Sequence, residues 1–204
     1  MTIENKQAVG VVGPIKSGKS TGANYLERVH HFSKYALSDR IREDVRQRAK
    51  KGGWSFDGLP EKDKRRILQN RGDELRARYG PAILAERTLE LIKKEKPALI
   101  VIESIRLPEE VGLIREELDA FILGISASPE MRHRLYLLSL GGEEITFEQF
   151  SAMDGRELAG KGAHKMKVGK ALEAADFVIL NEGTVADLER TIYGTLKVRG
   201  ILKG

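Results

Sequence analysis

Residues 13–20 have the types and the spacing that bind a chain of phosphates. They read Gly-Pro-Ile-Lys-Ser-Gly-Lys-Ser, which matches the phosphate-binding loop pattern G-x-x-x-x-G-K-[ST]. The two glycines permit backbone conformations that a Cβ would forbid, so that several N–H groups can point at one anion. Lys19 is expected to reach the β- and γ-phosphates, and the hydroxyl of Ser20 is expected to ligate Mg²⁺. The loop therefore predicts binding of a nucleoside triphosphate.

The residues on either side of this P-loop support the motif. Residues 8–12 are a short apolar run, which predicts a buried strand. Residues 21–28 are compatible with a helix that would add its positive dipole end to the loop. The alternative is an ordinary Gly/Lys/Ser loop that matches by chance, and the order strand, loop, helix argues against it. The residues predicted here to bind ATP are Gly13, Pro14, Ile15, Lys16, Ser17, Gly18, Lys19, Ser20 and Thr21.

Charged side chains follow two further apolar runs. Residues 32–37 predict a strand that leads to Asp39 and Arg40, and residues 98–102 predict one that leads to Glu103. Ligands of open α/β sheets gather past the carboxyl ends of the strands, so we expect Asp39 and Glu103 to face the P-loop. Glu103 suits a contact with Mg²⁺ or its water shell, and Asp39 suits orienting an acceptor or acting as a base. The alternatives are that Asp39 caps the following helix and that Glu103 is a solvent-exposed carboxylate.

The composition bounds the class of protein. The 204 residues suit one domain, and contents of 41% hydrophobic and 32% charged residues are typical of a globular fold. No run of 18 apolar residues and no basic start followed by an apolar stretch is present, so we expect no membrane span and no secretory signal. The chain has no cysteine, which excludes disulfides and cysteine-based metal sites and is compatible with a reducing cytoplasm. We therefore expect a cytoplasmic protein.

The net charge of +5 admits two kinds of partner. A basic domain can bind nucleic acid, or it can enclose a pocket for polyanionic nucleotides. The arginines are spread over several predicted elements, with no basic run and little aromatic interleaving, which favours the pocket. We expect nucleotide substrates, with neither a nucleic-acid nor a membrane partner, and the sequence carries no signal for an oligomeric state.

Apolar runs and amphipathic segments alternate along the chain. This alternation predicts an α/β fold in which helices cover both faces of a parallel sheet. From residue 141 to about 168 the chain is polar and lacks a clear core pattern, which is typical of a lid over a binding site. The predicted strands cover residues 8–12, 32–37, 98–102, 121–126 and 174–180.

Several segments together resemble the phage deoxynucleoside monophosphate kinases. They are the P-loop and residues 37–40, 68–76 and 102–111. Residues 175–184 are similar to the tail of dephospho-CoA kinases and of uncharacterised archaeal relatives. The resemblance covers most of the chain in order, and the P-loop is its most specific part.

The resemblance implies a three-layer P-loop NTPase fold, with one domain over residues 1–204 and a five-stranded parallel sheet in the order 2-3-1-4-5. It implies an acceptor-binding helical segment at about 38–96 and a helical and loop lid at about 130–168. Two departures stand out: Glu103, where the family usually has Asp, and Ile105, where Gly is common. By the resemblance, Asp39 and the acceptor-binding residues Arg40, Arg76 and Arg106 match acceptor-site positions, Arg132 and Arg134 match lid-proximal arginines, and Asn181 and Gly183 match the loop that borders the donor adenine.

These residues predict ATP-dependent transfer of the γ-phosphate to a (deoxy)nucleoside monophosphate with Mg²⁺ as cofactor. Phosphoryl transfer needs positioning and charge stabilisation, which Lys19, Arg132 and Arg134 would supply as catalytic residues together with Asp39. Ser20 and Glu103 would hold the metal. One alternative is transfer to a hydroxyl, as in dephospho-CoA kinase, which would use a base such as Asp39. The other is a P-loop NTPase with a nucleic-acid-linked or regulatory role.

Overall fold

A parallel five-stranded sheet lies at the centre of the computed structural model, which describes residues 7–140, 144–160, 162 and 165–202. The strands are β1 (Gln7–Val12), β2 (Ser33–Ala36), β3 (Leu99–Ile105), β4 (Phe121–Ser126) and β5 (Phe177–Leu180). They lie in the order β2-β3-β1-β4-β5, and each neighbouring pair is parallel. The predicted fold class and strand order are therefore confirmed.

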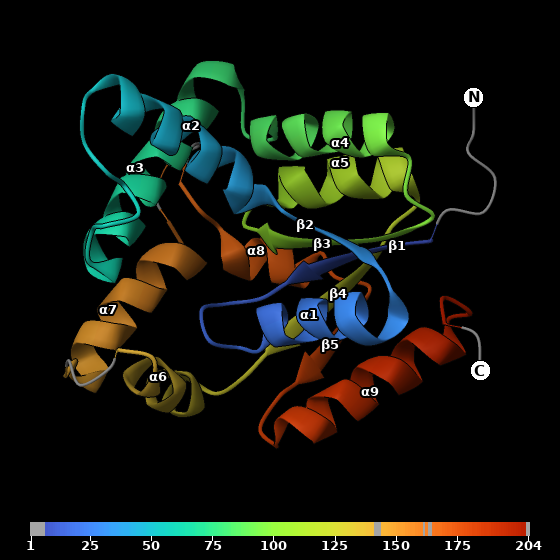
Figure 1. Ribbon diagram of the computed structural model, residues 1–204. Coiled ribbons are helices and arrows are strands. Elements are labelled where there is room, and N and C mark those ends of the chain that lie inside the picture. The colour runs from blue at the N-terminus through green and yellow to red at the C-terminus, as the bar shows by residue number, and fades with distance from the viewer. Residues whose placement is uncertain (1–6, 141–143, 161, 163–164, 203–204) are drawn as a thin grey trace.

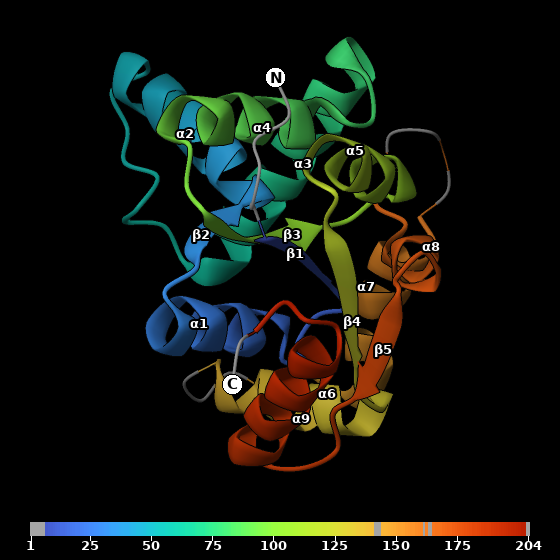
Figure 2. The same ribbon diagram turned by 90° about the vertical axis from the view of Figure 1, so that its right-hand side faces the viewer.

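Helices cover both faces of the sheet, as Figures 1 and 2 show. One face packs against α2, α4 and α5, and the other packs against α1 and α9. α6 and α7 lie together beyond the end of the sheet where β1 runs into α1 (Figure 1). The described helices are α1 (Lys19–His30), α2 (Leu37–Lys51), α3 (Glu61–Tyr79), α4 (Ile83–Glu95), α5 (Pro108–Leu118), α6 (Pro129–Leu138), α7 (Phe147–Leu158), α8 (Val168–Glu173) and α9 (Val185–Val198).

The strand that leads into the P-loop is buried on both faces. Val9 and Val11 belong to the core on the α1/α9 face, and Ala8 and Val12 belong to the core on the opposite face. This alternation follows from the two-residue repeat of a strand, and a central parallel strand is apolar on both sides for the same reason. The P-loop therefore begins from one of the most firmly packed strands of the protein.

β3 contains a bulge at its carboxyl end. Gly10 pairs with Ile102 and Val12 pairs with Ile105, so β3 uses one more residue than β1 over this stretch. Ser104 has a φ of 64°, a left-handed conformation that a side chain makes unfavourable. The predicted strand ends at residue 102, whereas the observed strand continues to Ile105, because apolar runs do not register bulges. A bulge bends a strand and redirects its side chains, and here it lies directly beside Glu103.

Two further boundaries differ from the sequence prediction. α2 begins at Leu37 with Ala36 at its N-cap, so Asp39 lies in the first turn and is not the cap. The early start places Leu37, Ile41 and Val45 on one buried face of the helix. The predicted lid contains α7, whose Phe150 is fully buried, although the segment lacks an apolar repeat. Residues 141–143, 161 and 163–164 of that predicted lid lie outside the described residues.

Among the helices that the structure describes, none combines the length and the apolar character that crossing a bilayer requires.

The P-loop and β4 approach each other so closely at Gly13 that we expect Gly13→Ala to destabilise the protein. An added Cβ would lie 2.1 Å from the carbonyl oxygen of Ile125 and 2.7 Å from Ser17 Oγ. We expect a loss of about 1–3 kcal/mol or more in the free energy of unfolding, measured by urea denaturation. The matched control is Gly112→Ala, because Gly112 is exposed in α5 with no atom within 4 Å of an added Cβ, and it should gain about 0.5–1 kcal/mol. Equal stabilities for the two variants would contradict this close approach.

Candidate functional site

The P-loop takes the shape of an anion cradle. Gly18 has a φ of 101° and Lys16 a φ of 60°, so two residues of the loop adopt the left-handed conformation. For Lys16 this conformation is strained, and such strain concentrates at binding sites. The amide of Ser17 donates to the Pro14 carbonyl at 3.3 Å, and Lys19 Nζ donates to the same carbonyl at 3.1 Å. The Lys19 side chain is thus folded over the loop at the start of α1.

The Lys19 ammonium group is buried among other charges. Burial and, after it, the neighbouring Arg106 lower its pKa to about 7, although Glu157 and Glu103 act in the opposite direction. A lysine in this setting gains from any added negative charge, since an anion restores the favourable environment of the ammonium. The electrostatics therefore fit a phosphate ligand at the loop.

Ser20 and Glu103 meet at the edge where β1 and β3 end. Ser20 Oγ donates a hydrogen bond of 2.6 Å to Glu103 Oε2. A hydroxyl and a carboxylate are oxygen ligands of the kind that Mg²⁺ uses together with substrate phosphates. Among the described residues, no cluster of three or more His, Asp or Glu side chains could hold a metal without such help. The pair fits a metal that arrives with a nucleotide.

The loop after β5 braces the P-loop. Asn181 Nδ2 donates to the Ser17 carbonyl at 2.9 Å, and the Asn181 amide donates to the Ser126 carbonyl at 2.7 Å. Gly183 precedes Thr184, which caps α9 through a capping box with Asp187. The structure thus places Asn181 against the P-loop backbone, and the predicted contacts of Asn181 and Gly183 with adenine stay predictions.

The three predicted acceptor arginines lie in three different settings. Arg106, just after β3, donates to Glu157 Oε2 at 2.8 Å. Arg76 is 3% exposed and lies 3.5 Å from Glu110 Oε1 in a buried ion pair. Arg40 forms an ion pair of 3.2 Å with Glu43 on α2. The structure therefore brings Arg106 to the P-loop lysine and gives Arg76 a position inside the protein.

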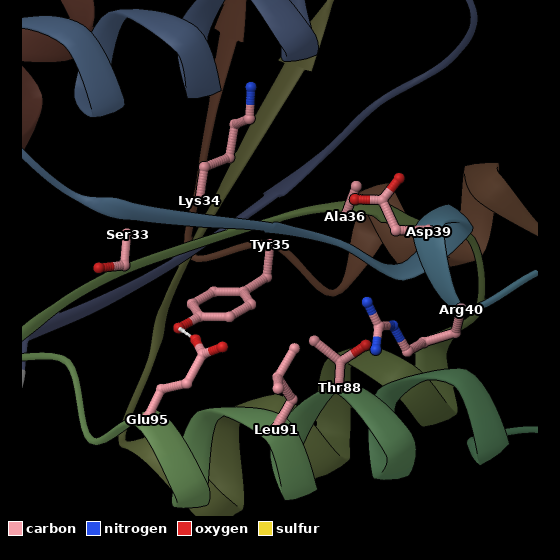
Figure 3. A pocket seen from close by; sticks show the side chains of 9 residues that line it. All are labelled: Ser33, Lys34, Tyr35, Ala36, Asp39, Arg40, Thr88, Leu91 and Glu95. Atoms are coloured by element: carbon pink, nitrogen blue, oxygen red, sulfur yellow. Dashed lines mark hydrogen bonds between the residues drawn. The ribbon is translucent and has the colours of Figure 1, made fainter. Parts of the chain in front are cut away.

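Asp39 and Arg40 line an open pocket at the edge of the sheet (Figure 3). The pocket has a volume of about 320 Å³ and lies between β2 and α4. Asp39 is exposed, and its described ionic contact is with Arg42 at 4.0 Å. In Figure 3 the two side chains project from the start of α2 toward this edge. Their predicted roles toward the acceptor stay predictions.

The two predicted lid arginines differ in environment. Arg132 is 3% exposed and holds Asp154 through both of its terminal nitrogens, with 2.8 Å between Nη2 and Oδ2. Its Nε donates to the Ala127 carbonyl at 3.0 Å. Arg134 is exposed and contacts Met131. Arg132 thus joins α6 to α7 in this structure, and Arg134 is free to reach solvent.

Sequence reasoning missed the carboxylate at the centre of the site, Glu157 of α7. Its carboxylate accepts hydrogen bonds from Arg65 and Gln69 of α3 and from Arg106. The side chain is 3% exposed. Burial alone would raise the pKa of Glu157, but Arg106 and Arg65 lower it below its ordinary value, so the group is ionised. A signal was present in the sequence, because Phe150, Asp154 and Glu157 follow the i, i+4, i+7 spacing of one helix face.

Glu110 is a second carboxylate that the sequence did not single out. It is fully buried, and its Oε2 accepts from the amides of Arg106 and Leu107 at 2.7 and 3.2 Å. Glu110 thereby satisfies two backbone amides at the start of α5 and holds the backbone of Arg106 in place. Because Arg76 is its buried ionic partner, Arg76 stabilises the segment that carries Arg106.

No protein-family model matches the chain. The chain is similar to several proteins described as UPF0200 proteins, a name that states no activity. One from Staphylothermus marinus is 32% identical over 124 residues, which is 60% of this chain and 62% of that protein, so the match spans less than two thirds of the relative. One from Hyperthermus butylicus is 27% identical over 88% of this chain and 87% of its own length.

Solved structures with the same fold include kinases. TT1252 from Thermus thermophilus matches with a TM-score of 0.60 and 25% identity, over 98% of this chain and all of that chain. Shikimate kinase from Aquifex aeolicus matches with a TM-score of 0.52 and 15% identity, over 97% of this chain and all of that chain. Dephospho-CoA kinase from Campylobacter jejuni matches with a TM-score of 0.50 and 19% identity, over 98% and 99%. The protein therefore has a P-loop kinase-like fold.

We expect Arg76→Met to destabilise the protein, because it leaves the carboxylate of Glu110 buried without its cation. Removal of one partner of a buried ion pair costs about 3–5 kcal/mol. Burial raises the pKa of Glu110, and Arg76 opposes this rise. Without Arg76 the folded-state pKa lies further above the unfolded value, so the contribution of Glu110 favours folding below the unfolded pKa and is lost as the pH rises from there to the folded-state pKa.

The measurement is urea denaturation of Arg76→Met at several pH values. The double variant Arg76→Met/Glu110→Gln is the control, because it removes the charge that titrates, and its stability should exceed that of the single variant at neutral pH. If Arg76→Met is as stable as the native protein, the arginine is available for an acceptor and does not stabilise the segment of Arg106.

Proposed function

We propose that the protein is an ATP-dependent phosphotransferase that moves the γ-phosphate to a (deoxy)nucleoside monophosphate. One observation carries the proposal: Arg106, just after β3, and Arg65 of α3 hold one carboxylate, Glu157, and the charges of all three act on the buried ammonium group of Lys19 in the P-loop. Cationic groups from the ends of β1 and β3 and from α3 thus converge on one point. Such convergence supports a site in which a donor phosphate and an acceptor phosphate are brought together.

Separate groups of residues bind the phosphate donor and the acceptor. The P-loop amides and Lys19 bind the β- and γ-phosphates and stabilise the charge that spreads over the transferred group. The Ser20 hydroxyl and Glu103 would hold Mg²⁺, which when bound would supply positive charge to the phosphates. Arg106 and Arg65 bind the acceptor phosphate through planar, two-pronged contacts. Arg132 and Asp154 fix α7 against α6, which keeps water away from the transferred group.

A monophosphate acceptor suits this arrangement because it is already ionised near neutral pH and needs no base. Two arginines beside the P-loop lysine offer it compensating charge. Transfer to a hydroxyl is the second candidate, and the names of the shikimate kinase and dephospho-CoA kinase of similar fold favour it. A hydroxyl acceptor would need a base, for which Asp39 is the candidate from the sequence.

Measurement of ADP release with a panel of acceptors tests the proposal. We expect release that depends on one or more (deoxy)nucleoside monophosphates, and we expect Lys19→Ala to reduce turnover by about 100-fold or more with an unchanged circular dichroism spectrum. ADP release with dephospho-CoA or shikimate, and with no monophosphate, would assign the protein to the hydroxyl class. Hydrolysis without any acceptor that DNA or RNA stimulates would assign it to the nucleic-acid-linked NTPases.

We expect ATP binding to take up a proton in mildly alkaline solution. The pKa of Lys19 is about 7 in the ligand-free protein, so Lys19 is mostly neutral at higher pH. The phosphates of ATP are fully ionised there and favour the ammonium form, so binding restores the proton. Calorimetry at about pH 8.5 in two buffers of different ionisation enthalpy should give an uptake approaching one proton, and Lys19→Gln should give none. Equal uptake in both proteins would assign the proton to another group.

A further inference from the structure

The carboxylate of Glu157 in α7 accepts hydrogen bonds from three side chains that lie on other elements. Arg65 and Gln69 of α3 donate to its Oε1, the latter at 3.0 Å, and Arg106 donates to its Oε2 at 2.8 Å. All three donors are 51 or more residues away in sequence. The residue is 2% exposed. A buried carboxylate therefore fills a set of guanidinium and amide donors that are themselves partly exposed.

The charges around Glu157 exceed what one carboxylate can balance. Arg65 and Arg106 contact it, and the field of Lys19 also acts on it. Burial lowers the pKa of the Lys16 ammonium group, and the nearby guanidinium of Arg65 also lowers it. A phosphate monoester carries up to two negative charges and three terminal oxygens, so it matches two guanidinium groups better than a carboxylate does. The donor set is thus suited to a phosphate that is not part of the protein.

α7 is attached to the molecule by ionic contacts on two sides. Asp154 pairs with Arg132 of α6, which lies beside α7 in Figure 1. One turn later, Glu157 pairs with α3 and with the residue after β3. Lys165, beyond the end of α7, forms an exposed ion pair with Asp73 of α3. Without the Glu157 contacts, α7 would still be joined to α6 through Asp154 and Arg132. Among the described residues, the ionic link to α3 would then be the exposed pair of Lys165 and Asp73.

We propose that Glu157 is a displaceable occupant of the acceptor phosphate site, and that a phosphate group which binds Arg65, Gln69 and Arg106 expels it and releases the end of α7. The proposal rests on the proposed function for the identity of the ligand as an acceptor phosphate. The anion site itself follows from the geometry alone. No covalent step is involved, because one anion replaces another on the same donors.

Anion affinity tests the proposal without any turnover. The probes are inorganic phosphate, a deoxynucleoside monophosphate and a non-hydrolysable ATP analogue, each measured by calorimetry. We expect Glu157→Gln to bind inorganic phosphate and the monophosphate about 10-fold or more tightly than the native protein, because the competing charge is gone. The affinity for the ATP analogue should change far less. Tightening for the analogue alone would assign the donor set to the donor nucleotide and overturn the proposal.

Two variants serve as controls. Glu148→Gln removes an exposed carboxylate from the same helix without touching the donor set, and its phosphate affinity should equal that of the native protein. Adding Arg65→Gln to Glu157→Gln should remove most of this gain in affinity, because Arg65 is one of the two cations of the donor set. Affinity in Glu157→Gln no higher than in the native protein overturns the proposal.

Hydrogen exchange of the native protein decides the matter if Glu157→Gln does not fold. Saturating inorganic phosphate should speed the exchange of the amides at the end of α7, and unchanged or slower exchange would overturn displacement. The outcome is separable from that of the acceptor panel. A protein that phosphorylates no acceptor but shows the affinity gain keeps the anion site and loses the kinase, and the reverse result keeps the kinase and loses the displacement.

Discussion

The buried ammonium group of Lys19 is the charge around which the structure is arranged. A lone buried cation of this kind costs several kcal/mol unless opposite charge lies close by. Glu103 and Glu157 supply that charge, but burial, together with Arg106 and Arg65, outweighs them, so the pKa of Lys19 falls to about 7. The ligand-free site is consequently a set of opposing charges held close together by three helices and two strand ends.

The fold supplies these charges from segments that are far apart in the sequence. β1 is buried on both faces and holds the P-loop, while the bulge in β3 turns its end so that Glu103 reaches Ser20. Ser104 has a positive φ at this bulge, an unfavourable conformation that the surrounding pairing enforces. The longer carboxylate side chain at position 103 thus contacts the P-loop serine directly. The unfavourable backbone conformation of Ser104 thus accompanies the position of Glu103 against Ser20.

The layers of the fold were predictable from the sequence because buried strands and helix faces require apolar residues at a regular spacing. The apolar runs that became β1, β3 and β4 are continuous, and the P-loop lies where its residue pattern requires. The bulge at Ser104 was not predictable from the sequence, because an extra residue in a strand changes the pairing register and not the composition. The early start of α2 at Leu37 was missed because the apolar run before it reads equally well as strand. Both errors lie at the ends of elements, where tertiary contacts decide.

The site was harder to predict than the fold because its buried partners are ionic. Arg132 and Arg76 look like free cations in the sequence, and the structure gives each a buried carboxylate, Asp154 and Glu110. The pattern of apolar residues does not reveal a helix such as α7, because two of its three buried side chains are acids. Buried acids are stable only beside cations, so polar residues at helical spacing in a basic protein mark an ionic interface. Glu157 is such a residue, because it joins α7 to Arg65 of α3 and to Arg106 after β3, and a phosphate that bound these two arginines would compete with it.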